Sequence, residues 1–218
     1  MKAVIFDMDG VLFDTERLAI RCWDEIGDAC GLGKVGYMVF KTLGRTTPES
    51  VRIFREEFGN RFDNDRFPAL YRAWLQAYYS THPVPVKEGV YSLLATLKAL
   101  DYRTAVASSS SRESVLHHLN DAGITHCFDS IISGDMISRS KPEPDIYLAA
   151  AHALGEKPED CYAVEDSRSG LWSAHRAGCR VVMVPDIWEC DSETARIVDV
   201  CFPTLTEFEK TLQANQGR

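Results

Sequence analysis

Five short apolar runs, each bounded by polar or turn-forming residues, constrain this chain more than any other feature. None alternates regularly between apolar and polar residues, so each is predicted to be a strand with both faces buried. From the second run onward they are separated by stretches with helical periodicity, an order typical of a parallel sheet with helical crossovers. The runs occupy residues 2–6, 103–107, 130–133, 161–164 and 180–184.

The long stretch between the first two runs is predicted to form a helical lobe. Residues 16–80 show helical periodicity throughout, with an apolar stripe that includes Trp23, Phe54 and Trp74. The following segment, "THPVPVKEG", contains two prolines and predicts an extended return to the sheet. We therefore expect an α/β fold in which residues 1–14 and 84–218 form the sheet-containing core and residues 15–83 form an inserted helical domain.

Charge and cysteine content restrict the classes of partner. The 218 residues carry a formal net charge of -8 with no visible basic stripe, which disfavours nucleic acid. The first apolar run is far too short for a signal segment or a membrane span. The seven cysteines form neither a C-x-x-C pair nor a zinc-like grouping, which favours a reducing compartment. We expect a cytoplasmic monomer or weak dimer with no membrane or nucleic-acid partner.

Chemically reactive side chains follow four of the five predicted strands. Ligands of parallel sheets bind at the carboxyl ends of the strands, so these side chains are expected to converge. Each one alone has an ordinary interpretation as a turn, helix-cap or surface residue, and only their shared position predicts a site. They are Asp7 and Asp9 after the first run, Ser108 after the second, Lys141 after the third, and Glu165 and Asp166 after the fourth.

The chemistry of this set predicts a phosphoryl-transfer site. Asp7, Asp9 and Asp166 would repel one another unless a cation joined them, and oxygen ligands without a nearby His or Cys favour Mg²⁺. Lys141 adds a positive charge, and the Ser108 hydroxyl can donate to a phosphoryl oxygen. Backbone N–H groups of a helix predicted to begin near residue 110 can assist. Phosphoryl transfer needs mainly positioning and charge stabilisation, which these groups supply.

These motifs, in this order, resemble those of the haloacid dehalogenase (HAD) superfamily. "DMDGVLFD" resembles its first motif, Ser108 its second, Lys141 its third and "VEDS" its fourth. The helical insertion is similar to the cap of the subgroup that contains β-phosphoglucomutases and small-metabolite phosphatases. The resemblance implies a Rossmann-like three-layer core with a parallel sheet and an inserted, mobile α-helical cap domain.

The resemblance implies a role for each aspartate of the first motif. Asp7 would be the nucleophile that forms an aspartyl-phosphate. Asp9 would protonate the leaving alcohol and then accept a proton from the attacking water. Dehalogenating members of the superfamily lack this second aspartate, so the presence of Asp9 favours phosphoryl transfer.

The resemblance also implies how the metal and the phosphate would be held. Mg²⁺ would be bound by the Asp7 carboxylate, the Asp9 main-chain carbonyl and Asp166, with Glu165 close by. The transferred phosphate would be bound by Ser108, Ser109 and Lys141. The expected partner is a small phosphorylated substrate.

The choice between phosphatase and mutase depends on the cap. The position of a histidine characteristic of β-phosphoglucomutases is Ala19 here, and that of an arginine for the sugar's second phosphate is Thr47. Both departures favour a Mg²⁺-dependent phosphatase for a sugar or polyol phosphate. A mutase stays an alternative, because a small slip in the alignment would let Arg45 replace the missing cation. Arg45 is therefore a candidate substrate contact, although "LGRTTPES" also suits a plain helix start with Thr47 as its cap.

A third reading is a non-enzymatic, receiver-like module that carries a phospho-aspartate. In receivers the phosphoacceptor follows a middle strand, whereas here the first strand already carries Asp7 and Asp9. The inserted helical lobe also separates this chain from that class.

Overall fold

The apolar run at the N-terminus forms the central strand β1 (Ala3–Phe6), in which all four side chains are buried. In the computed structural model, which describes residues 1–215, β1 pairs in parallel with two neighbours. The complete parallel sheet has the order β3-β2-β1-β4-β5-β6. The other strands are β2 (Arg103–Ser108), β3 (Ser130–Ser133), β4 (Cys161–Glu165), β5 (Arg180–Met183) and β6 (Val200–Cys201).

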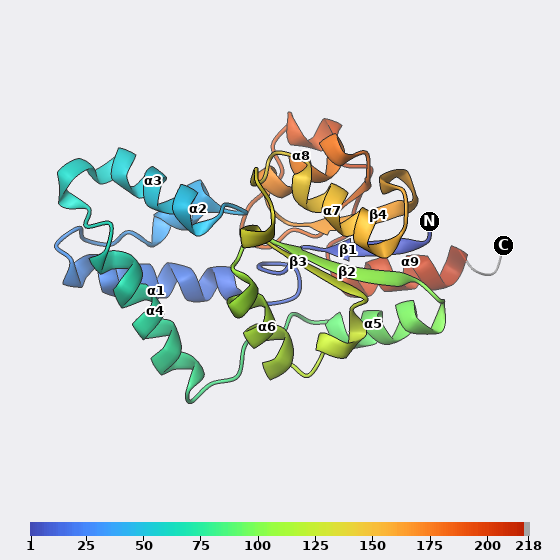
Figure 1. Ribbon diagram of the computed structural model, residues 1–218, viewed down its shortest axis with the longest axis horizontal. Coiled ribbons are helices and arrows are strands. Elements are labelled where there is room, and N and C mark those ends of the chain that lie inside the picture. The colour runs from blue at the N-terminus through green and yellow to red at the C-terminus, as the bar shows by residue number, and fades with distance from the viewer. Residues whose placement is uncertain (216–218) are drawn as a thin grey trace.

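Helices cover both faces of this sheet, which gives three layers. Val4 and Phe6 of β1 point to one face, and Ala3 and Ile5 point to the other. Figure 1 shows α7 and α8 above the sheet and α5 and α6 below it. The predicted α/β architecture is confirmed. The first face is covered by α5 (Val90–Ala99), α6 (Arg112–Asp121) and α9 (Leu205–Asn215), and the second by α7 (Asp145–Leu154) and α8 (Arg168–Ala177).

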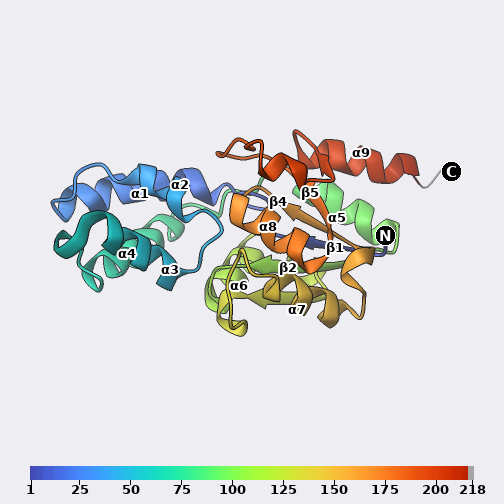
Figure 2. The same ribbon diagram turned by 90° about the horizontal axis from the view of Figure 1, so that it is seen from above.

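The inserted segment is helical and has its own apolar core. Aromatic rings of three helices meet there, with the Trp23 and Phe54 centroids 5.0 Å apart and the Phe54 and Phe67 centroids 4.9 Å apart. Figures 1 and 2 show this lobe at one end of the molecule, on the opposite side of the sheet from the C-terminus. Its helices are α1 (Thr15–Ala29), α2 (Val39–Thr42), α3 (Thr47–Phe58) and α4 (Arg66–Tyr79).

Helix starts agree with the sequence patterns to within one residue. Ser167, in the fourth motif, caps α8 by accepting a hydrogen bond from the Gly170 N–H. Helix α6 is capped by Ser111, one residue after the predicted Ser110. Helix α3 is capped by Thr46 in a capping box with Glu49, so the expectation of Thr47 as the cap was wrong by one position.

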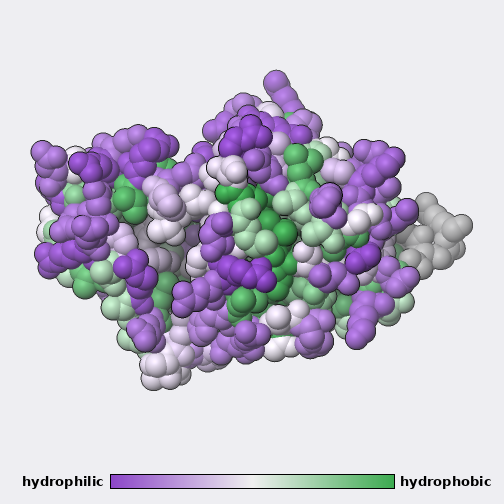
Figure 3. Space-filling model, viewed as in Figure 1, coloured by the Kyte–Doolittle hydropathy of each residue, from purple (hydrophilic) through white to green (hydrophobic). Residues whose placement is uncertain are grey.

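The outer surface on the face seen in Figure 3 is mostly hydrophilic, with apolar side chains gathered near the middle of the sheet-containing half. The apolar side chains of the strands are packed inside, between the two helical layers. Within residues 1–215, every helix is too short or too polar to cross a membrane.

Candidate active site

A tight turn after β1 brings the first motif against the fourth. The Asp7 N–H donates to the Val164 carbonyl (2.9 Å), which continues the pairing of β1 with β4. The chain then turns through Gly10, whose φ is +82°. A Cβ atom at Gly10 would lie 2.1 Å from Asp166 Oδ2. Glycine is therefore needed here both for the backbone conformation and for the approach of Asp166.

Lys141 joins the carboxylates of two different strands. Its Nζ donates to Asp7 Oδ1 and to Glu165 Oε1, each over 2.6 Å, and its side chain is 0% exposed. Burial and the nearby Glu165 charge raise the pKa of Asp7 to about 8, although Lys141 acts in the opposite direction. Burial alone would lower the pKa of Lys141, but Asp7 and Glu165 outweigh it and raise that pKa. One ammonium group therefore serves two buried carboxylates.

The Glu165 carboxylate is fully engaged by protein donors. Its Oε1 accepts from Lys141 and from the Tyr147 hydroxyl (2.8 Å). Its Oε2 accepts from the Asp166 N–H (3.1 Å) and from the backbone N–H and hydroxyl of Ser167 (3.2 and 3.1 Å). Such a carboxylate orients Lys141 and has little remaining capacity for a metal. The sequence predicts Glu165 close to the metal and does not identify Tyr147 as part of the site.

Asp166 is in the opposite situation. Its side chain is 1% exposed, and within residues 1–215 neither carboxylate oxygen has a hydrogen-bond partner. Burial, followed by the charges of Glu165 and Asp7, raises its pKa well above the usual value. Asp7, Glu165 and Asp166 each place a carboxylate oxygen within 4.8 Å of the others. Orphaned, buried oxygens beside a second carboxylate fit a hard divalent cation.

Asp9 is held between the core and the inserted helices. The Thr15 hydroxyl, at the start of α1, donates to its Oδ1 (2.7 Å), and the Ser110 hydroxyl donates to its Oδ2 (3.0 Å). These two residues were not identified from the sequence as parts of the site. Each lies next to a predicted motif: Thr15 follows Asp9 by six residues, whereas the contact of Ser110 with Asp9 spans 101 residues of the chain.

The two serines predicted to bind phosphate have different surroundings. Ser108 is fully buried at the end of β2, and its hydroxyl oxygen accepts from the Ser110 N–H (3.1 Å). Ser109 donates its hydroxyl to the Gly44 carbonyl of the inserted lobe (2.8 Å). The Ser109 hydroxyl therefore ties the lobe to the core in this structure.

A cavity of about 430 Å³ opens above these groups, between the sheet edge and the inserted helices. Asp7 and Asp9 line it from the core, and Arg45 lines it from the lobe. Arg45 Nη1 also donates to the Lys141 carbonyl (2.9 Å), so this arginine contacts the loop of the third motif. The opposite wall is aromatic, and its residues include Trp23, Phe54, Phe62, Phe67, Tyr71 and Tyr79.

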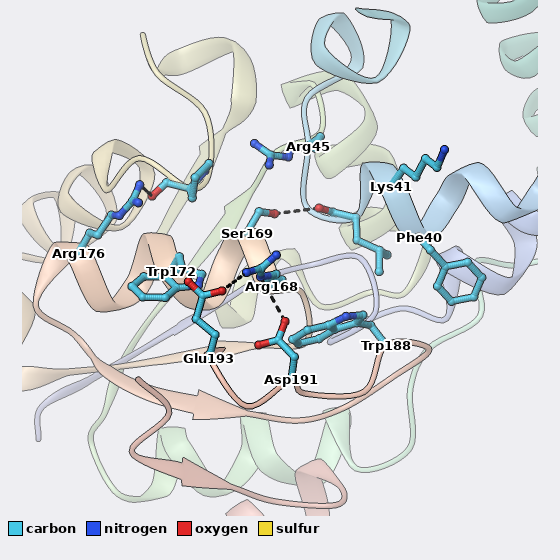
Figure 4. A pocket seen from close by; sticks show the side chains of 12 residues that line it. Phe40, Lys41, Arg45, Arg168, Ser169, Trp172, Arg176, Trp188, Asp191 and Glu193 are labelled. Atoms are coloured by element: carbon cyan, nitrogen blue, oxygen red, sulfur yellow. Dashed lines mark hydrogen bonds and ion pairs between the residues drawn. The ribbon is translucent and has the colours of Figure 1, made fainter. Parts of the chain in front are cut away.

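A second cavity, of about 500 Å³, lies where α2 approaches α8 (Figure 4). Arg168 in its wall is paired with Asp191 and Glu193, and Ser169 donates to the Leu43 carbonyl (2.8 Å). Neither Asp7 nor Asp9 lines this cavity. The cavity above Asp7 and Asp9 is therefore the candidate active site, despite its smaller volume.

The family model of haloacid dehalogenase-like hydrolases matches residues 4–184, which include all of the residues of the candidate active site. The chain belongs to this family. Membership confirms the resemblance drawn from the four motifs, and it makes the chain an enzyme of the hydrolase type. The receiver-like alternative is thereby removed.

Relatives place this HAD-like hydrolase in the subgroup of β-phosphoglucomutases and phosphatases. CbbY from Rhodobacter capsulatus is 36% identical over 202 residues, covering 85% of this chain and 86% of its own. The crystal structure of a variant of CbbY from Rhodobacter sphaeroides with xylulose-1,5-bisphosphate has a TM-score of 0.80 at 28% identity, covering 95% and 96%. The phosphorylated carbohydrates phosphatase of Thermotoga maritima is 29% identical (82% of each chain), and the β-phosphoglucomutase of Bacillus subtilis is 30% identical (84% and 83%).

Proposed function

We propose that this phosphoric monoester hydrolase is a Mg²⁺-dependent phosphatase that acts on a small sugar or polyol phosphate through an aspartyl-phosphate on Asp7. The observation that carries the proposal is the placement of Asp7 between the buried Lys141 ammonium and the unpartnered Asp166 carboxylate. Asp7 also lines the cavity, so its carboxylate is accessible to a bound phosphate ester.

In this mechanism Asp7 attacks phosphorus while the core holds the phosphoryl oxygens. Lys141 keeps the Asp7 carboxylate oriented and offsets part of the negative charge that the phosphate brings. Glu165 keeps Lys141 in place through its own hydrogen-bond network. A divalent ion held by Asp7 and Asp166, with the Asp9 main-chain carbonyl as a further ligand, would supply charge neutralisation in this site.

Asp9 moves the protons. It donates one to the leaving alcohol oxygen during formation of the aspartyl-phosphate, and it accepts one from water during hydrolysis. The Thr15 and Ser110 hydroxyls hold its carboxylate at the cavity wall for both steps. We take the helical insertion, residues 15–83, as a mobile cap that closes over the substrate and excludes bulk water.

The cavity supports a phosphatase rather than a mutase. Ala19 and Thr47, which stand where mutases carry a histidine and an arginine, both line it. Neither side chain can make the charge-assisted contact that the histidine or the arginine makes at the same position. Relatives that act on or bind phosphorylated carbohydrates support a sugar or polyol phosphate as the substrate class. We also propose a cytoplasmic setting, supported by seven unpaired cysteines.

The test is release of inorganic phosphate from a panel of sugar, polyol and nucleotide monophosphates in Mg²⁺, with Asp7→Asn as the control. We expect turnover by the wild-type enzyme and none by Asp7→Asn. Retained activity in the variant would overturn the assignment of Asp7. Incubation with β-glucose 1-phosphate and its bisphosphate primer tests the mutase, which requires glucose 6-phosphate to form faster than free phosphate.

A further inference from the structure

One face of α6 lines the cavity that contains Asp7 and Asp9. Ser111, Ser114 and His118 are three and four residues apart, so they share one side of the helix, and all three line the cavity. Ser110, just before the helix, donates its hydroxyl to Asp9. A polar stripe therefore runs from the reacting carboxylates along α6 to His118.

His118, at the far end of this stripe, is buried but incompletely bonded. It is 5% exposed, and its ring packs edge-on against Phe13 and Tyr79, with centroid distances of 5.6 and 5.4 Å. In the part of the chain that the structure describes, its Nδ1 has no hydrogen-bond partner. An unsatisfied buried polar group destabilises the fold, so native proteins rarely keep one without a purpose.

A residue that lines the cavity from the cap also carries an unpaired ring nitrogen. Trp23, on α1 of the cap, is 9% exposed, and its Nε1 also lacks a partner among the described residues. Its ring packs against Phe54 and Tyr71, with centroid distances of 5.0 and 5.9 Å. The core and the cap thus each contribute to the cavity wall a residue whose buried ring nitrogen is unpaired.

We propose that His118 is a specificity-determining residue whose imidazole hydrogen-bonds a hydroxyl group of the substrate's alcohol portion, while Trp23 donates to a second oxygen of that portion from the cap. This inference rests on the proposed phosphatase function and narrows its substrate class. The substrate is a phosphate monoester of a polyhydroxylated alcohol that extends from Asp7 along α6 to His118.

The charge state of His118 suits a hydroxyl partner. Burial lowers the pKa of His118, with a further lowering by His117 and opposing effects of Asp9 and Asp121, so the ring is neutral at neutral pH. A neutral imidazole has one donor and one acceptor nitrogen, and a hydroxyl can pair with either. A second phosphate group would be better matched by a guanidinium, such as Arg45 or Arg72 elsewhere in the cavity wall.

The experiment compares substrates with and without hydroxyl groups in three variants. His118→Phe keeps a ring against Phe13 and Tyr79 but removes both nitrogens, and His118→Asn restores one donor and one acceptor. His117→Phe is the matched control, because His117 is exposed, packs on the same Tyr79 ring (5.6 Å) and does not line the cavity. The substrates are acetyl phosphate, which carries no hydroxyl chain, and glycerol 3-phosphate, ribose 5-phosphate and glucose 6-phosphate.

We expect His118→Phe to lower kcat/KM for the best polyol or sugar substrate by about 10- to 100-fold, the range for a lost buried hydrogen bond. Acetyl phosphate turnover should change by less than about twofold, His118→Asn should recover part of the loss, and His117→Phe should lose nothing. Equal losses on both substrate classes would show a structural role and overturn the proposal. The proposal would also be overturned if the best substrate were a bisphosphate whose kcat/KM is unchanged in His118→Phe.

If the proposed function is wrong, the wild-type enzyme will release phosphate from none of these compounds. His118 is then tested by binding alone. Calorimetry would measure the dissociation constants of the same three sugar and polyol phosphates for Asp7→Asn with and without His118→Phe. Binding weakened about 10-fold by the second substitution supports the assignment, and unchanged binding overturns it.

Discussion

Replacing Asp166 with asparagine is expected to stabilise the metal-free protein, although it removes a proposed metal ligand. The Asp166 carboxylate is buried, its oxygens have no hydrogen-bond partner within the described chain, and the carboxylates of Asp7 and Glu165 lie within 4.8 Å. Asparagine has almost the same shape without the charge. The substitution therefore removes a buried, repelled charge while leaving the surrounding packing in place.

The size of the effect follows from the cost of such a group. An unsatisfied buried polar group costs about 1–3 kcal/mol and a charged one more, so a gain of about 1–3 kcal/mol in unfolding free energy is expected at neutral pH without metal. For a protein of this length, each kcal/mol corresponds to a shift in Tm of roughly 2–4 °C. The new amide has no ready partners either, which places the expected gain toward the lower end.

The pH dependence has a definite sign. Burial and neighbouring carboxylates raise the folded-state pKa of Asp166 above the usual 3.8, so the folded protein binds this proton more tightly than the unfolded chain does. The stability that protonated Asp166 gives the folded protein is complete below the pKa of Asp166 in the unfolded chain. It is lost as the pH rises toward the pKa of Asp166 in the folded protein. Metal-free wild type should therefore lose stability from about pH 4 upward, and Asp166→Asn should lose less.

The assay is thermal unfolding followed by circular dichroism, in a chelator and in Mg²⁺. At a Mg²⁺ concentration 100 times its Kd, the wild type should gain about 2.7 kcal/mol, and Asp166→Asn should gain much less because a ligand is missing. The order of stability should thus reverse between the two conditions. Asp101→Asn, in an exposed turn with a φ of +57°, is the control and should behave as wild type. A variant that is less stable in chelator, or that keeps the full Mg²⁺ gain, would refute the reasoning.

Three further substitutions test neighbouring parts of the site. Asp9→Asn should lower kcat by on the order of 10²–10⁴-fold for sugar phosphates and by less for p-nitrophenyl phosphate, whose leaving group needs no proton; steady-state kinetics would contradict this if both losses were equal. Lys141→Met should destabilise the protein by about 3–5 kcal/mol in urea unfolding, because Asp7 and Glu165 lose their shared cation; an unchanged midpoint would count against it. Gly44 has a φ of +68°, and a Cβ atom there would lie 2.4 Å from a hydroxyl of the core. Gly44→Ala should therefore raise KM and increase hydrogen exchange in residues 43–46. Exchange equal to that of the wild type would argue against a role of this contact in holding the cap to the core.

The arrangement of the core was predictable because its signals are local. Runs of apolar residues identify strands buried on both faces, and the parallel arrangement then places Asp7, Ser108 and Glu165 at the same edge of the sheet. Strand β6 was missed because two residues, Val200 and Cys201, are too short to form a pattern.

The roles of individual oxygens were not predictable, because they depend on partners far away in the chain. Ser109 is predicted to bind phosphate, and only the structure shows that its hydroxyl contacts Gly44, 65 residues away. Glu165 is predicted close to the metal, and only the structure shows that Lys141 and Tyr147 contact its carboxylate. The same limit hid His118, which carries no ligand-like spacing in the sequence.

The sequence alone determined the family, the parallel sheet and the set of charged residues that converge on one edge, because apolar periodicity and motif order can be read without knowledge of any long-range contact. Only the tertiary structure decided which carboxylate is satisfied and which is left without a partner. Asp7 and Lys141 are 134 residues apart in the chain, yet their contact and the isolation of Asp166 depend on packing to within an ångström. Hydrogen bonding is that sensitive to distance, and no pattern of residue types encodes it.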